Sequence, residues 1–152
     1  MNQAGYIPKG RFERERVGAV AVYCSDGRYN EQFDEFLHEH LGLPRYDRLV
    51  IPGGPAALAG HFSAYREEEM LVDQVRFLIE SHELERVVLI AQAGCGFYRK
   101  RLMVSDERLR GQQEEDLRKA AARVLGVSRK VEVSAYVAAL AEGRVVIEPV
   151  RV

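Results

Sequence analysis

The 152-residue sequence predicts an α/β fold: a mostly parallel central sheet, flanking helices and a C-terminal strand pair. Three observations predict this class. Short, nearly continuous apolar runs are typical of strands buried inside a parallel sheet. Segments with helical spacing of apolar residues separate these runs, so strands and helices alternate. The chain then closes with two runs of alternating polarity joined by residues 141–143, which favours a pair of adjacent strands.

The apolar runs and the alternating runs define five expected strands. These strands are residues 17–23, 46–51, 86–91, 131–140 and 144–150. The tetrapeptide Pro52-Gly53-Gly54-Pro55 follows the second of them and is a strong turn signal.

Helical spacing predicts three helices, at residues 30–41, 66–81 and about 105–125. In the first, Phe33, Phe36 and Leu37 stand at i, i+3 and i+4 and so share one face. In the third, Gly111 is a point at which the helix could divide. Residues 1–16 are polar and charged and predict an N-terminal arm on one domain that spans residues 1–152.

Composition narrows the function classes. The 22 basic residues nearly balance the 23 acidic ones, and a net charge of −1 gives no reason to expect nucleic acid binding. No apolar run approaches the roughly 20 residues of a membrane helix. The first 16 residues contain no signal-peptide core, so we expect a cytoplasmic protein. Two cysteines do not make a disulfide framework.

Both cysteines lie in short motifs that follow apolar runs. Cys24-Ser25-Asp26-Gly27-Arg28 follows the first expected strand, and Gln92-Ala93-Gly94-Cys95-Gly96 follows the third. Ligands of parallel sheets bind at the carboxyl ends of strands, where the strand order reverses. If the first and third strands are neighbours, the two thiols meet.

These residue types suit a metal site. Thiolates bind zinc well and a carboxylate can complete a tetrahedron, so Cys24, Cys95 and Asp26 are candidate zinc ligands. Arg28, two residues after Asp26, can pair with that carboxylate and so control whether it faces the metal.

The two motifs together resemble the β-class carbonic anhydrases. That family carries Cys-x-Asp-x-Arg after its first strand and His-x-x-Cys-Gly after its third. The resemblance implies a β-carbonic-anhydrase-like fold, zinc held by Cys24 and Cys95, and a catalytic pair of Asp26 and Arg28. It also implies reversible hydration of carbon dioxide to bicarbonate and a homodimer or higher homo-oligomer.

The sequence departs from this pattern at one ligand. Gln92 stands where the family has its zinc-binding histidine, and a neutral amide oxygen suits zinc poorly beside thiolates. Zinc is therefore an uncertain cofactor, and we expect weak or lost activity. His61, in another loop, is a conceivable substitute, although an exposed loop histidine is the simpler interpretation.

Other interpretations stay open. A non-catalytic relative could bind a small anion through Arg28 and Gly96. The spacing Cys95-x5-Arg101 also occurs in cysteine-dependent phosphatases, whose loop cradles a phosphate. The cysteines could instead be small buried apolar residues, or form a disulfide, which is unusual in the cytoplasm.

Overall fold

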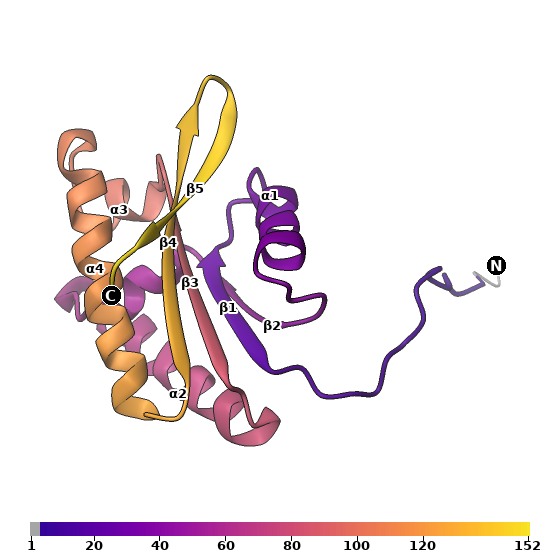
Figure 1. Cartoon of the computed structure of the whole chain (residues 1–152). Helices are drawn as coiled ribbons and strands as arrows, with labels where there is room; N and C mark the ends of the chain where they lie inside the picture. Colours follow the sequence, from indigo (N-terminus) through magenta and orange to yellow (C-terminus); the bar gives the residue numbers. More distant parts are fainter. Residues whose placement is uncertain (1–3) are drawn as a thin grey trace.

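The computed structural model describes residues 4–152 and contains one five-stranded sheet with helices on both faces (Figure 1). The strands are β1 (Ala19–Cys24), β2 (Asp47–Ile51), β3 (Arg86–Gln92), β4 (Glu132–Ala141) and β5 (Arg144–Val150). They lie in the order β2-β1-β3-β4-β5; the first four are parallel and β5 is antiparallel to β4. The predicted α/β class, mostly parallel sheet and C-terminal strand pair are confirmed.

The helices form two unequal layers. They are α1 (Asn30–Glu35), the π-helical turn η1 (Phe36–His40), the 3-10 helices η2 (Gly54–Ala59) and η3 (Phe62–Ala64), α2 (Tyr65–His82), α3 (Gly96–Lys100) and α4 (Asp106–Val127). The long helices α2 and α4 cover one face of the sheet and α1 packs on the other (Figure 1).

Three of these elements were not expected from the sequence: η2, η3 and α3. The helix predicted at residues 30–41 changes from α-helical to π-helical at Phe36, and Gly111 lies inside α4 without dividing it.

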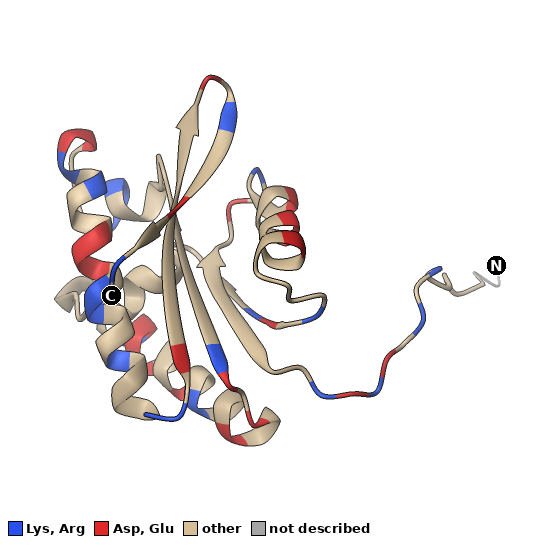
Figure 2. Cartoon of the chain, viewed as in Figure 1, with Lys and Arg blue, Asp and Glu red and all other residues tan. Residues whose placement is uncertain are grey.

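The alternation of side chains along β1 explains why both faces need cover. Val20 and Val22 belong to the apolar cluster that includes α2 and α4. Ala21 and Tyr23 belong to the cluster on the α1 side, where the Tyr23 ring meets Phe33 edge-to-face. All six residues of β1 are buried, as expected for a strand with helices on both faces. Charged residues gather on the helices, the turns and the N-terminal arm (Figure 2).

The N-terminal arm, residues 4–16, runs away from the sheet and forms no helix or strand (Figure 1). Its apolar side chains Tyr6, Ile7 and Phe12 are 86–88% exposed. Residues 1–3 of the predicted arm lie outside the described residues. Within residues 4–152, no helix combines the length and the apolar character needed to cross a membrane.

Gly54 brings η2 against the end of β1. Its φ is +52°, and a Cβ added there would lie 2.7 Å from the backbone nitrogen of Cys24 and 2.7 Å from the carbonyl carbon of Tyr23. Real Cβ atoms do not approach backbone this closely, so only glycine fits. The segment after β2 therefore packs directly against the backbone of Cys24.

We expect Gly54→Ala to lower the free energy of unfolding by about 3 kcal/mol or more, because it adds a backbone clash to a left-handed conformation. The matched control is Gly42→Ala. Gly42 has a φ of +66° but open space around its Cα, so only the conformational cost of about 1 kcal/mol applies. Urea denaturation followed by circular dichroism measures both; equal losses would contradict the close approach.

Candidate functional site

The two cysteines meet at the carboxyl edge of the sheet. Cys24 is the last residue of β1, and Cys95 follows β3 by three residues and caps the start of α3. Because β1 and β3 are parallel neighbours, with Tyr23 opposite Ile90, both strands deliver their motifs to one edge. Both thiols are free and buried, 7% and 1% exposed, in a cluster with Ala56, Tyr98 and Leu109.

The thiols share one hydrogen bond. The hydrogen bond from Cys95 lowers the pKa of Cys24 below the usual thiol range, and the Gln92 amide and the Gly53 N–H act in the same direction. The Gly53 nitrogen lies 3.4 Å from the Cys24 sulfur. The pKa of Cys95 is raised by its hydrogen bond to Cys24 and by burial. Of the two thiols, Cys24 is therefore the more acidic.

Asp26 and Arg28 form a closed pair in the turn after β1. The Arg28 Nε donates to Asp26 Oδ1 at 2.9 Å, and Nη2 donates to Oδ2 at 2.6 Å. The backbone N–H of Arg28 adds a third bond to Oδ1 at 3.1 Å. The hydrogen bonds from Arg28 lower the pKa of Asp26, so the carboxylate is charged and held toward the guanidinium.

Gln92 lies beside the thiols, at the position where the family places histidine. Its side chain is buried, and its backbone carbonyl accepts a 2.8 Å hydrogen bond from Gln113 Nε2. The Gln92 amide contributes to the lowered pKa of Cys24. Within residues 4–152, however, no group accepts a well-formed hydrogen bond from its Nε2. The Gln92 amide thus acts on the Cys24 thiol but makes no well-formed side-chain hydrogen bond through Nε2.

His61 is paired with Asp116 and not with the thiols. Its Nε2 lies 2.7 Å from Oδ2 of Asp116, a carboxylate with no exposed side-chain surface. The Tyr98 hydroxyl donates to the same oxygen at 2.7 Å, and Gln112 Nε2 donates to Oδ1 at 2.8 Å. The Asp116 cluster therefore ties the loop before η3, helix α3 and helix α4 together. His61 is neither an exposed loop residue nor a third ligand for the thiols.

The described residues do not fit the zinc site of the β-class family. The two sulfur donors are present, but the third position holds an amide, and Asp26 and His61 have partners of their own. Across residues 4–152, no group of three or more His, Cys, Asp or Glu side chains is placed to hold a metal ion. Two thiolates alone leave half of a tetrahedral zinc site without protein ligands.

Arg101, the arginine of the Cys95-x5-Arg101 spacing, is not free to bind a phosphate beside Cys95. Arg101 donates through Nη2 to the backbone carbonyl of Ser63 at 3.0 Å and pairs with Glu67 at 2.7 Å. Its guanidinium therefore faces the start of α2. Gly96 begins α3, a helix of only five residues.

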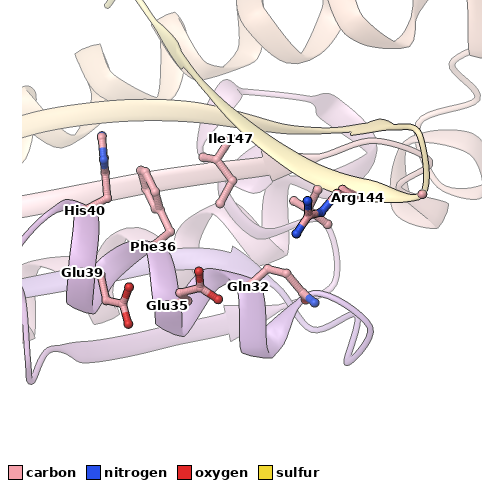
Figure 3. A pocket seen from close by; sticks show the side chains of 9 residues that line it. Gln32, Glu35, Phe36, Glu39, His40, Arg144 and Ile147 are labelled. Atoms are coloured by element: carbon pink, nitrogen blue, oxygen red, sulfur yellow. The ribbon is translucent and has the colours of Figure 1, made fainter.

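One of three cavities in the structure borders the second cysteine motif. Figure 3 shows one of about 690 Å³ between α1–η1 and the β4–β5 hairpin, where Phe36 and Ile147 lie across from each other. Two others, of about 720 and 380 Å³, lie near Arg16 and near Gly94. Neither cysteine lines any of these three cavities, although Ala93, Gly94 and Leu109, which neighbour the thiols, line the smallest of them.

Two contributors to this site were missed by sequence reasoning. Gly53 was read only as part of a turn, although two consecutive glycines after a buried strand do signal a close backbone approach. Asp116 stands in a charged stretch of α4 beside the half-buried Glu114 and the exposed Glu115. The signal that could have found it is its helical spacing of seven residues from Leu109 and four from Ala120, which places it on the apolar face.

Comparison with known proteins agrees with this fold. The model of a family described as "Putative carbonic anhydrase" matches residues 14–147. No curated protein sequence matches the chain. Among solved structures, the chain is similar to β-carbonic anhydrase isoform I of Trichomonas vaginalis, at a TM-score of 0.57 and 10% identity over 98% of this chain and 90% of that one.

A carbonic anhydrase from Streptococcus mutans is similar at a TM-score of 0.54 and 16% identity, over 98% of this chain and 88% of that one. At such identities the likeness shows the fold alone. The family match, by contrast, spans most of the sequence. This chain therefore belongs to the putative carbonic anhydrase family and has a β-carbonic-anhydrase-like fold.

Proposed function

We propose that this chain is a carbonic-anhydrase-like protein in which reversible hydration of carbon dioxide is weak or lost. The observation that supports this most directly is the pair of thiols with Gln92 at the third ligand position. Cys24 and Cys95 would be the metal ligands that remain, and Asp26 and Arg28 the remaining catalytic pair. Without a third strong donor, such a site binds zinc weakly.

Restoring the missing donor tests this proposal. We expect Gln92→His to raise zinc content from well below to about one ion per chain, because imidazole completes a set of three soft or borderline ligands. Zinc is measured by mass spectrometry after dialysis, and hydration of carbon dioxide by stopped-flow indicator assay.

The matched control is Gln74→His, which adds a histidine on the exposed face of α2. It should leave zinc content unchanged. Stoichiometric zinc and full hydration activity in the parent protein would overturn the proposal. An unchanged zinc content in a folded Gln92→His variant would show that residue 92 does not face the metal position.

A second candidate function is binding of a small anion such as bicarbonate, and the unsatisfied Nε2 of Gln92 favours it. A buried donor without an acceptor is costly, and an oxyanion would supply one. In this role Arg28, with 78% of its side chain exposed, would add a cation, and Gly96 would add its backbone N–H. In this role the family scaffold serves recognition and needs no metal.

We expect Arg28→Ala and Gln92→Leu each to weaken bicarbonate binding about tenfold, the value of one charge-assisted hydrogen bond. Binding is followed by NMR chemical-shift titration of the metal-free protein. Arg66→Ala, at an exposed arginine near the start of α2, serves as the control. Equal affinities in all four proteins would exclude this anion site.

We also propose that the chain assembles as a homodimer or higher homo-oligomer through its N-terminal arm. Three apolar side chains of the arm are almost fully exposed, although water is an unfavourable environment for them. Arg45 is one of the few groups of the body that hold the arm, through the carbonyls of Glu13 and Glu15.

Removal of residues 1–12 should therefore convert the assembly to monomers, as measured by light scattering coupled to gel filtration. Circular dichroism of the shortened chain provides the control for folding. A parent protein that is already monomeric at micromolar concentration would contradict the proposed assembly.

A further inference from the structure

We propose that the cavity between α1–η1 and the β4–β5 hairpin receives the N-terminal arm of a second copy of this chain. The inference rests on the assembly through the arm proposed above, and it names the surface that the arm binds. Three properties support it: the chemistry of the cavity, the matching chemistry of the arm, and the places of the two on the fold.

The cavity, which we call the hairpin groove, has an apolar floor beside two carboxylates. Its volume is about 690 Å³, and Phe36 and Ile147 lie across from each other in it (Figure 3). Glu35 and Glu39 line the α1–η1 side and are exposed. Arg144 lines the hairpin side. Two carboxylates against one guanidinium leave the groove acidic, so it suits an apolar partner that carries cations.

The charged side chains of the hairpin groove have no competing partners. The acids next to them in the sequence, Asp34 and Glu148, each pair with an arginine of the body. Within residues 4–152, by contrast, no ion pair involves Glu35, Glu39 or Arg144. A cation that enters the groove therefore displaces only water from these two carboxylates.

The arm is fixed to the body only at its root. Arg45 donates to the carbonyls of Glu13 and Glu15, and Arg16 contacts the loop after α2. Beyond this root, residues 4–12 are all exposed, and we call them the free arm. Nine residues of extended chain span up to about 30 Å, which is long enough to reach across a neighbouring molecule.

The free arm has the chemistry that the hairpin groove lacks. It carries two cations, Lys9 and Arg11, and no acid. Tyr6, Ile7 and Phe12 supply apolar side chains that are 86–88% exposed. An aromatic side chain buries about 150–250 Å² when it is covered. Four such rings from two arms, with the surfaces that cover them, reach the roughly 1,000 Å² that a specific interface needs.

The positions of arm and groove favour a second copy over the groove of the same chain. The arm joins the N-terminal end of β1 and runs away from the sheet (Figure 1). The hairpin turn lies at the opposite edge of the sheet, because β4 is parallel to β3 and β3 to β1. A two-fold dimer in which each free arm binds the partner's hairpin groove makes the same contact twice and closes.

Charge reversal tests this contact in the full chain. We expect Glu35→Lys/Glu39→Lys to raise the dissociation constant of the assembly at least about tenfold, because cations of the arm then meet cations of the groove. Lys9→Glu/Arg11→Glu should have the same effect from the other side of the contact. Analytical ultracentrifugation measures the dissociation constants, and circular dichroism confirms that each variant is folded.

Mixing the two variants distinguishes binding between copies from binding within one chain. In a mixed dimer the unchanged arm of one variant meets the unchanged groove of the other, and the reversed arm meets the reversed groove. An equimolar mixture should therefore form heterodimers with nearly the parent affinity, although each variant alone dissociates. A mixture that stays monomeric would overturn the exchange of arms between copies.

The matched control is Glu69→Lys/Glu80→Lys, which reverses two exposed charges on α2, the helix on the other face of the sheet. It should leave the dissociation constant unchanged. An assembly that is lost on removal of residues 1–12 but survives both charge reversals would overturn the hairpin groove and leave assembly through the arm standing. A parent protein that is monomeric would overturn both.

Discussion

The parallel pairing of β1 with β3 is the constraint on which the site depends. Each strand is short and buried on both faces, so its register is fixed by packing and not by a turn. With that register set, two motifs far apart in sequence finish at the same edge, and their cysteines join one buried cluster. A shift of one residue would turn the Cys24 side chain to the opposite face, toward α1.

Around the thiols, most polar side chains have a hydrogen-bond partner within the protein. Asp26 is bound by Arg28, and His61 by Asp116. The Cys24 sulfur accepts a hydrogen bond from the Gly53 N–H. The Asp26–Arg28 pairing agrees with the pair that the resemblance implies, so the departure of these residues from the family's zinc site rests on Gln92, whose Nε2 has no well-formed hydrogen bond.

Much of the fold could be predicted because a strand that is buried on both faces has a nearly continuous apolar sequence. The Val-rich runs and the alternating C-terminal pair needed no further information. The meeting of Cys24 with Cys95 could be anticipated only by supposing that their strands are neighbours. Three other features could not be predicted, because each depends on segments brought together by tertiary packing. They are the close approach of Gly54 to β1, the hydrogen bond between His61 and Asp116, and the ion pair between Arg101 and Glu67. The change to π-helical geometry at Phe36 escaped for a different reason: apolar spacing over so few residues is the same in both helix types.

Strand β5 is the edge strand on one side of the sheet and pairs with β4, so that Pro149 lies opposite Tyr136. It contains Pro149, which lacks the N–H that a further strand would need, next to the charged Glu148. Such residues discourage another chain from extending a sheet by hydrogen bonding along its free margin. Aggregation by strand pairing along this edge is therefore disfavoured, although the C-terminal hairpin is exposed.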